Sequence, residues 1–539
     1  MKKIYKVTFF IMAVLSLSGC EKLDLDLAPE DQFTDANYWT SEDKAQSLLN
    51  TAYSQMYSSS HFFYNEAASD NAYMGRGDAA GAASLAAGTY DASLARISQE
   101  WSDRYAGIKS TNILLENIDR VPDLPEETLN RMKAEARFIR AFQHFMLMTW
   151  FGDIPLLDSD ISIEEAQTIT RTPREEVLSF ILSELDHAAE VLPANTELPA
   201  AERGRITSGA AVALKARVQL YEGNWSGVIQ ETEKLINGGA YGSYGLFPSY
   251  EGLFLPENEY NQEGIFSIQY VPELRTWGEF FDLAPLSAGA RLNAMAPTQD
   301  LVDSYLTASG QMISEAGSGY DEENPYENRD PRLEATVVYH GYEWENPDGS
   351  THTIYIEPGS DPDEPLDEYA PGSSATSTGY YLRKYFDPEH QSGLASGLNL
   401  ILLRYADVLL MHAEAKMELG EFDESTWNMT IRPIRERAGF TDPAALDYPS
   451  SLGQEELRDL IRNERRIELA MEGLRIFDIR RWEIAEDVLN GWVRGARFGP
   501  NNTYLQVSQR TFDPSRHYLW PIPRDERLIN DNLTQNPNW

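Results

Sequence analysis

Apolar residues recur along much of this chain at the spacing of an α-helix. Positions 134, 138, 141, 145 and 148 are apolar and lie four or three residues apart, and positions 403, 406, 410, 413 and 417 do the same. This spacing gives a helix one apolar face, which packs against a core. Similar patterns predict further helices over residues 42–57, 99–118, 173–192, 208–221, 225–235, 424–438 and 454–471.

Two helical segments share one arrangement of small and aromatic residues. In 216–225 and again in 413–422, an alanine is followed seven positions later by glycine and nine positions later by an aromatic residue. The alanine allows a neighbouring helix to approach, and the glycine ends its helix in the left-handed conformation. The arrangement resembles the turn between helices of tetratricopeptide repeats; two unrelated helical hairpins are the alternative.

The character of the chain changes between residues 241 and 398. Gly, Pro, Ser and Asp become frequent, and strand-like pieces are short, at 265–270, 333–339 and 351–356. Loops this long in a compact protein are usually functional or disordered, and the many aromatic residues favour function. The acidic run 357–369 is interpreted as a solvated loop, although a structural calcium ion is possible there.

These patterns together predict a mainly α fold. We expect an α-helical superhelix with tetratricopeptide-like helix pairs and a loop-rich central insertion with short strands. Residues 20–539 form one domain in this prediction, with a helical part (20–240), an insertion that binds ligand (241–398) and a second helical part (399–539).

The first twenty residues have the composition of an export signal. Lys2, Lys3 and Lys6 precede the apolar stretch 7–17, which is too short to span a bilayer. The stretch ends in Leu-Ser-Gly-Cys at Cys20, which resembles the bacterial lipobox. We therefore expect a signal peptide over 1–19, acylation of Cys20 and anchoring of the mature chain by its acyl chains; an ordinary secretory signal is the alternative.

Composition excludes several classes of protein. The chain has 539 residues, of which 42% are hydrophobic, and a formal net charge of −40. That charge repels phosphate backbones, so we expect no nucleic-acid partner. Cys20 is the only cysteine, so an internal disulfide or a thiolate zinc site is impossible.

The sequence offers no motif for catalysis. Its eight histidines are scattered without metal-ligand spacing, and it lacks a GxSxG nucleophile turn and a phosphate-binding loop. We expect no catalytic residues, no metal site and no cofactor. Arg and Glu alternate at helical spacing in 457–474, which predicts structural ion pairs along the helix. Trp101, Trp150 and His412 are assigned to the core.

Four segments resemble the signatures of a known family. Residues 462–482, with Arg-Asn-Glu-Arg-Arg-Ile-Glu-Leu at their start, are similar to the C-terminal signature of the SusD/RagB family. Leu-Leu-Arg-Tyr-Ala-Asp at 402–407 is similar to the family's signature as well. Residues 134–155 are similar to its N-terminal signature, and residues 519–537 resemble its usual C-terminal end. With the lipobox, the resemblance covers nearly the whole mature chain.

The resemblance implies a function outside the cell. Members of this family are surface lipoproteins of Bacteroidota that act as the lid of a SusC-like, TonB-dependent β-barrel transporter and capture glycan or peptide for it without catalysis. We therefore expect a cell-surface glycan-binding lipoprotein that delivers oligosaccharide to such a transporter. Peptide capture is one alternative, and a surface glycoside hydrolase is another, because 85 acidic residues offer many carboxylate pairs.

The resemblance also directs attention to two regions, 62–90 and 277–326, where family members build the ligand site. From composition and location within them, we predict Tyr73 and Trp277 as platforms for sugar rings, because sugar C–H faces pack on aromatic rings. The predicted polar contacts are Asp70, Asn71 and Arg76, with Tyr320 next. For each of these residues, a buried aromatic ring or a solvated charge is the alternative.

Overall fold

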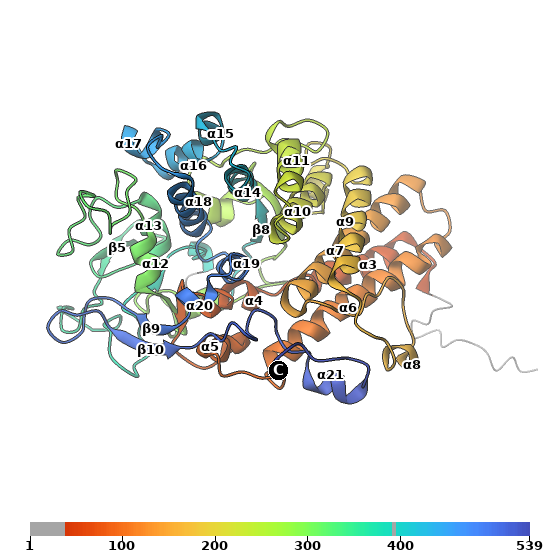
Figure 1. The fold of residues 1–539 in the computed structure, drawn as a ribbon, viewed down its shortest axis with the longest axis horizontal. Coiled ribbons are helices and arrows are strands. Elements are labelled where there is room, and N and C mark those ends of the chain that lie inside the picture. Colours follow the sequence, from red (N-terminus) through yellow and green to blue (C-terminus); the bar gives the residue numbers. More distant parts are fainter. Residues whose placement is uncertain (1–37, 391–394) are drawn as a thin grey trace, which may run out of the picture.

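The computed structural model describes residues 38–390 and 395–539, and α-helices dominate it (Figure 1). Eight helices form its helical body, and each packs against the next along the chain. They are α3 (Glu42–Ser54), α6 (Ala95–Asn117), α7 (Glu126–Phe151), α9 (Arg174–Val191), α10 (Ser208–Tyr221), α11 (Trp225–Ile236), α14 (Tyr405–Glu418) and α18 (Gln454–Glu468). The mainly α fold with successive helix pairs is confirmed. The predicted signal peptide and Cys20 lie outside the described residues.

Shorter helices connect these eight or lie at the ends of loops. They are α4 (Ser59–Tyr64), α5 (Ala82–Ala87), α8 (Ile163–Ala166), α12 (Gln299–Ser304), α13 (Pro331–Thr336), α15 (Glu424–Met429), α16 (Ile431–Ala438), α17 (Pro443–Leu446), α19 (Arg475–Arg481), α20 (Ala485–Val488) and α21 (Arg524–Ile529). In the described part of the chain, no helix combines the length and the apolar character that crossing a bilayer requires.

The two glycines singled out in the sequence end their helices as predicted. Gly223 follows α10 with φ +66°, and Gly420 follows α14 with φ +71°, both in the left-handed region that glycine adopts without strain. Asn224 then caps α11, because its side chain accepts a hydrogen bond from the N–H of Gly227. The turn at Gly223 reverses the chain, so that α11 packs on α10, and α11 also packs on α14.

Three predicted elements differ from the structure. Position 403, predicted to lie in the helix that ends at Gly420, lies in strand β8 (Leu400–Arg404), because this segment pairs with Gly264–Ile268, and α14 begins only at Tyr405. The helix over 424–438 is two helices, α15 and α16, that meet at Thr430. Pro433 has no N–H for a bond back across that junction, and the Thr430 hydroxyl donates to the carbonyl of Thr426 instead. The strand predicted over 333–339 is mostly helix α13. Asp330 caps this helix and Pro331 occupies its first turn, a start signal that outweighs the β-branched residues after it.

Strands occur only as antiparallel pairs in the described residues, five in all. They are β1 (Ala72–Met74) with β3 (Met295–Pro297), β2 (Gly264–Ile268) with β8 (Leu400–Arg404), β4 (Val337–Val338) with β7 (Tyr381–Leu382), β5 (Tyr342–Glu345) with β6 (Thr351–Ile354), and β9 (Gly491–Arg494) with β10 (Gln506–Arg510). The β1–β3 pair joins the segment after α4 to the insertion. The β2–β8 pair joins the insertion to the C-terminal helices.

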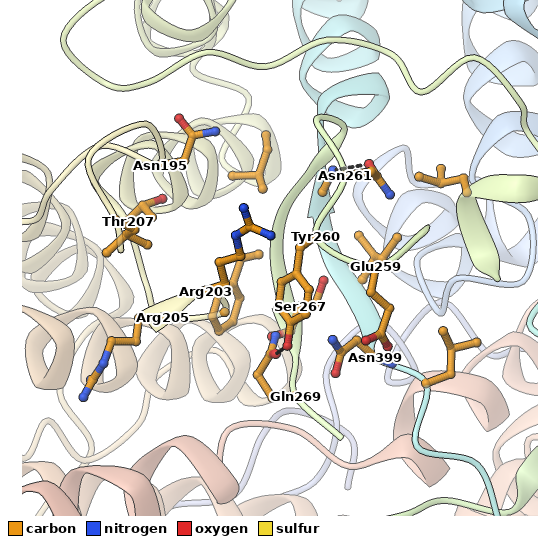
Figure 2. A pocket seen from close by; sticks show the side chains of 18 of the residues that line it. Asn195, Arg203, Arg205, Thr207, Glu259, Tyr260, Asn261, Ser267, Gln269 and Asn399 are labelled. Atoms are coloured by element: carbon orange, nitrogen blue, oxygen red, sulfur yellow. Dashed lines mark hydrogen bonds between the residues drawn. The ribbon is translucent and has the colours of Figure 1, made fainter. Parts of the chain in front are cut away.

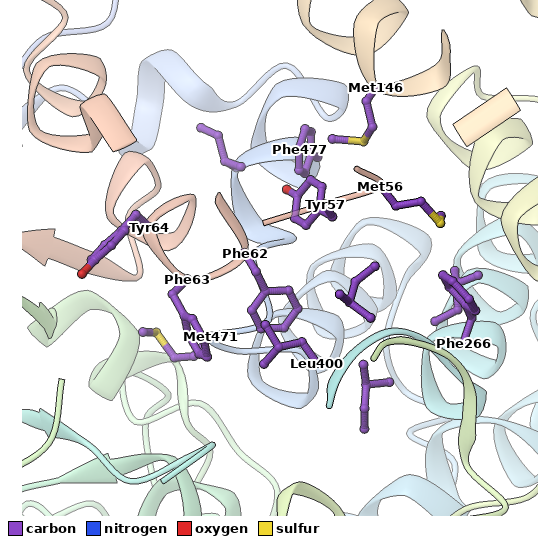
Figure 3. Packing of buried hydrophobic residues seen from close by; sticks show 14 of the residues in the cluster. Met56, Tyr57, Phe62, Phe63, Tyr64, Met146, Phe266, Leu400, Met471 and Phe477 are labelled. Carbon is purple, nitrogen blue, oxygen red and sulfur yellow. The ribbon is translucent and has the colours of Figure 1, made fainter. Parts of the chain in front are cut away.

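One hydrophobic core extends from Trp39 to Leu533 and includes side chains from both helical parts and the insertion. Figure 3 shows its centre, where Phe62 and Phe63 of α4 lie among residues from α7, the β2–β8 pair and the C-terminal segment. Trp101 and Trp150 are buried in this core, as predicted. His412 is buried as well, with its Nδ1 2.9 Å from the hydroxyl of Thr232.

The charged helix α18 forms ion pairs, but they connect different elements. Glu468 binds Arg332 of α13 at 2.9 Å and Arg404 of β8 at 2.7 Å, with every partner buried. Arg465 binds Asp407 of α14 at 2.5 Å and Asp478 of α19 at 2.9 Å. The prediction of structural ion pairs was right in kind and wrong in geometry, since the partners are tertiary. A buried charge needs a partner of opposite sign, so this network fixes how the elements pack.

Candidate ligand-binding site

The two regions predicted to build the site meet at a hollow of about 240 Å³. Tyr64, at the end of α4, comes from the first region, and all other lining residues come from a loop in the second. The lining residues are Tyr64, Gly278, Glu279, Phe281, Asp282 and Arg291. The structure therefore brings the two segments together, although through residues other than the ones predicted.

Backbone hydrogen bonds give the loop of the hollow its shape. The N–H of Arg291 donates to the carbonyl of Phe281 at 3.3 Å, and the N–H of Ala294 donates to that of Asp282 at 2.7 Å. The carbonyl of Ala294 then accepts from the N–H groups of Gly75 and Arg76. The loop is thus closed upon itself and tied to the segment after β1, which places Arg76 beside it.

The charged groups of the hollow are already paired. Arg291 donates two hydrogen bonds, of 2.7 and 2.8 Å, to the carboxylate of Asp282. The guanidinium group of Arg291 can still reach a ligand, because the Arg291 side chain is 56% exposed. Burial raises the pKa of Tyr64, and the neighbouring carboxyl groups of Asp282 and Glu279 raise it further. Tyr64 therefore stays protonated and serves as a donor.

Glu279 adds a second carboxyl group to the hollow. Its Oε1 accepts from the hydroxyl of Ser59 at 3.0 Å, and its Oε2 accepts from the N–H of Gly278 at 3.2 Å. Burial raises the pKa of Glu279 above the ordinary value. Phenol, carboxyl and guanidinium groups thus surround one small space. Such a mixture of donors and acceptors suits a ligand rich in hydroxyl groups.

Trp277 does not form the predicted platform for a sugar ring. It is 4% exposed, and its ring packs 4.9 Å from that of Phe63 and 5.3 Å from that of Phe280. Its Nε1 donates to the carbonyl of Leu398 at 2.7 Å. Both the ring and its polar atom are used within the protein, so we correct this prediction and assign Trp277 to the core.

Asp70 and Asn71 are also corrected, because both are buried and fully engaged. Asp70 binds Arg475 at 2.8 Å and Arg466 at 2.9 Å. Asn71 accepts from Arg466 at 2.9 Å and donates to Glu66 at 2.9 Å. These two residues connect the segment after α4 to the C-terminal charged segment and have a structural role.

The other three predicted residues lie partly exposed and remain predictions. Tyr73 is the middle residue of β1, paired with Ala296. Arg76 donates to the carbonyl of Ala375 at 3.1 Å. Tyr320 lies in the insertion, apart from Tyr73 and Arg76, and its ring centre is 5.3 Å from the guanidinium carbon of Arg329. The structure brings Arg76 close to the hollow through the Ala294 carbonyl, but places none of the three among its lining residues.

The insertion has a second hollow, of about 170 Å³, that is richer in aromatic residues. Tyr326 and Tyr380 line it with their hydroxyl groups 3.4 Å apart, and Tyr504 donates to Glu322 at 3.1 Å. Sequence reasoning missed these residues as well as Tyr64, Asp282 and Arg291. No motif marks them. Tyr64, Asp282, Arg291 and Tyr326 lie within the two predicted regions, whereas Tyr380 and Tyr504 lie outside both.

The described residues contain no group of three or more His, Cys, Asp and Glu side chains that could hold a metal ion. The acidic run predicted as a solvated loop folds back on itself. Glu368 accepts hydrogen bonds from the N–H groups of Gly359 and Asp361. A calcium ion in this loop remains an untested prediction.

Comparison with known proteins identifies the family. Residues 262–539 match the model of the SusD family, and residues 25–220 match a model described as starch-binding associating with outer membrane. A helical fold of this kind, with paired helices and a loop-rich insertion, is the SusD architecture. The chain belongs to the SusD family.

Individual relatives resemble the chain over nearly its whole length. SusD-like protein P2 of Formosa agariphila is 29% identical over 563 residues, which cover 99% of each chain. The crystal structure of a SusD-like carbohydrate-binding protein from Bacteroides fragilis is 30% identical, with a TM-score of 0.82 over 92% of this chain and 100% of that one. A laminarin-binding SusD-like protein shares the fold at 23% identity, with a TM-score of 0.67 over 93% of this chain and 100% of that one.

Proposed function

We propose that this protein is a cell-surface lipoprotein that binds an oligosaccharide and does not cleave it. The observation that carries the proposal is the hollow at Tyr64, Asp282 and Arg291, which joins two distant segments in a member of the SusD family. Relatives described as carbohydrate-binding and laminarin-binding support a glycan as the ligand. In this proposal the open side of Arg291 and the hydroxyl of Tyr64 donate to sugar hydroxyls, and the two carboxyl groups accept from them.

We further propose that the protein delivers its glycan to a SusC-like TonB-dependent transporter. Acylated Cys20 would tether it to the outer membrane, which agrees with the family model of starch-binding proteins that associate with that membrane. Residues 21–37 would link the anchor to α3. Copurification of a β-barrel transporter from solubilised outer membranes tests the partner; recovery of the lipoprotein alone would contradict it.

The hydrolase alternative has one observation in its favour. Glu279 and Asp282 both line the hollow, and burial raises the pKa of Glu279. Glycoside hydrolysis uses two carboxyl groups that flank one ligand. Against this, both groups are bound to protein partners. Incubation with starch and laminarin oligosaccharides decides the matter, because any release of shorter products would overturn the non-catalytic proposal.

Titration calorimetry with maltoheptaose and laminarihexaose tests binding at the hollow. We expect Arg291→Ala to weaken binding at least about tenfold, because an Arg hydrogen bond to a ligand contributes on the order of 1.5–3 kcal/mol. Arg432→Ala is the matched control, since Arg432 is likewise a partly exposed arginine in an ion pair, on α16. If the wild type and Arg291→Ala bind these sugars with equal affinity, the hollow is not the binding site. Binding of peptides in place of both sugars would favour the peptide alternative.

A further inference from the structure

A larger cavity, of about 350 Å³, lies where the helical body meets the β2–β8 pair (Figure 2). Its walls are the segment that precedes α10, the loop that enters β2 and the residues beside β8. The polar lining residues labelled in Figure 2 are Asn195, Arg203, Arg205, Thr207, Glu259, Tyr260, Asn261, Ser267, Gln269 and Asn399. It shares no lining residue with the hollow at Tyr64. Its volume is within the range of small-molecule sites.

One wall of this cavity has an acceptor and a donor without protein partners. Glu259 Oε1 accepts a hydrogen bond of 2.6 Å from the backbone N–H of Asn399, and Asn399 Oδ1 accepts one of 2.7 Å from the N–H of Tyr270. Within residues 38–390 and 395–539, Glu259 Oε2 and Asn399 Nδ2 have no hydrogen bond. Asn399 is only 5% exposed, so both side chains are held in place while one polar atom of each stays available.

Tyr260 places an exposed aromatic ring at the same cavity. The residue has φ +57°, a left-handed conformation that is unusual for tyrosine, and its side chain is among the exposed ones at 51%. Its hydroxyl donates to Gln269 Oε1 at 2.6 Å, which fixes the ring direction. The turn is held by Asn261, whose Oδ1 accepts from the N–H groups of Glu263 and Gly264. A strained residue fixed in this way is a common feature of ligand sites.

The charges of the cavity favour a neutral ligand. Arg203 is exposed and has no ion pair among the described residues, while Arg205 is neutralised by Glu135 at 2.7 Å. Glu259 carries the charge opposite to that of Arg203, and these two side chains form no ion pair with each other. Glu259 would repel an anionic ligand, and Arg203 would repel a cationic one. The floor adds apolar surface from Leu253, Phe254 and Ile401.

We propose that this cavity is a second binding site, for a neutral mono- or disaccharide. Glu259 and Asn399 bind adjacent hydroxyl groups of one sugar, and the ring of Tyr260 covers its C–H face. The inference rests on the proposed function, since it takes a glycan as the ligand. It goes beyond the proposed function by assigning a separate short-saccharide site beside the β2–β8 pair.

Calorimetry on the full chain in detergent tests this site with glucose, maltose and laminaribiose as probes. We expect Glu259→Gln and Tyr260→Ala each to weaken binding of at least one probe about tenfold or more. Glu257→Gln is the control for charge, because Glu257 is on the same loop but does not line the cavity. Trp492→Ala controls for loss of an exposed ring, at 48% exposure on β9. Both controls should bind as the wild type does.

The outcomes separate this inference from the function on which it rests. If the cavity variants bind every probe as tightly as the wild type, while Arg291→Ala weakens binding, the second site is overturned and the proposed function stands. If a cavity variant loses binding that Arg291→Ala retains, the second site is supported. If neither short probes nor long oligosaccharides bind the wild type, the proposed function fails as well. Binding of alanyl-alanine but of no sugar would overturn the saccharide assignment.

Discussion

Asp70 and Arg475 are 405 positions apart in the chain, and their side chains form a double hydrogen bond with N···O distances of 2.8 and 2.9 Å. Both are buried, and Arg466 adds a third contact to the same carboxylate. Burial alone would raise the pKa of Asp70, but the two arginines outweigh it and hold the pKa below its ordinary value. Asp70 therefore remains charged, and its ion pairs hold the segment after α4 to the C-terminal segment that contains Arg466 and Arg475.

Replacing this carboxylate should destabilise the protein strongly. We expect Asp70→Asn to lower the free energy of unfolding by about 3 kcal/mol, because it leaves two buried arginines without a counter-charge. Denaturant titration measures the change. Asp119→Asn is the matched control, since Asp119 is 60% exposed in its ion pair with Lys133 and should change stability by less than about 1 kcal/mol. Equal effects of the two substitutions would contradict a structural role for Asp70.

Stability should fall in mild acid because of buried His144. Burial lowers the pKa of His144 to about 4, while an unfolded histidine titrates near about 6.5. Between these values the unfolded chain binds a proton that the folded one does not, so the free energy of unfolding falls as pH falls from 6.5 to 4. Its share is up to about 3 kcal/mol. His144→Gln should flatten the dependence of the denaturation midpoint on pH over this range. His187→Gln should flatten it less, because His187 is partly exposed, although burial lowers its pKa as well. Parallel curves for His144→Gln and the wild type would refute this.

Because Trp277 is buried, replacing it should destabilise the fold and leave the affinity for the ligand unchanged. Trp277→Ala should lower the free energy of unfolding by about 3–5 kcal/mol, since it leaves a cavity beside Phe63 and removes the bond to Leu398. At temperatures where the variant remains folded, its affinity for maltoheptaose should match the wild type. A stable variant with weaker binding would restore Trp277 to the ligand site.

Gly473 should not tolerate a side chain. It has φ +76°, and a Cβ atom there would lie 2.4 Å from the carbonyl oxygen of Phe62. We expect Gly473→Ala to cost at least about 2 kcal/mol in the free energy of unfolding, from left-handed backbone plus collision. Gly319 has the same φ with open space around it, so Gly319→Ala measures the backbone cost alone and should be milder. Similar costs at both positions would show that the Phe62 contact relaxes.

The predicted anchor is tested directly at Cys20. Cys20→Ser removes the only thiol that could be acylated, so we expect the variant to leave the membrane fraction and to lose the mass of its lipid. Fractionation and intact-mass spectrometry measure both. A variant that remains in the outer membrane would show that residues other than Cys20 hold it there.

Helices could be predicted well because their signals are local. The apolar spacing in 208–221 and the glycine after it fixed α10 to the residue, and Gly420 marked the end of the helical segment that contains α14. The sequence predicted that the residues of α18 form ion pairs, but it did not predict their partners. Residues 464 and 468 show the helical spacing of charges, but nothing in that spacing shows that Arg332 and Arg404 arrive from other elements. Long-range pairing is not encoded in local periodicity.

The site was predictable as a pair of regions and not as residues. Composition singled out Trp277 and Asp70, the residue types most typical of sugar contacts, yet the same types also fill cores and buried ion pairs. The hollow forms because the loop after Gly278 closes on itself through backbone hydrogen bonds, and because Gly75 and Arg76, far away in the sequence, bond to the carbonyl of Ala294. Only the assembled structure shows which aromatic rings keep a free face.

The contact between Gly473 and Phe62, with Glu66 accepting from the Gly473 N–H at 2.7 Å, has a consequence for biogenesis. A chain made from its amino end presents α4 long before residue 473 exists. Until then Glu66 has its local partner Asn71 but lacks the N–H of Gly473. The nascent polypeptide must therefore be shielded from aggregation throughout most of its passage, and it reaches its final shape only once its last segment has emerged.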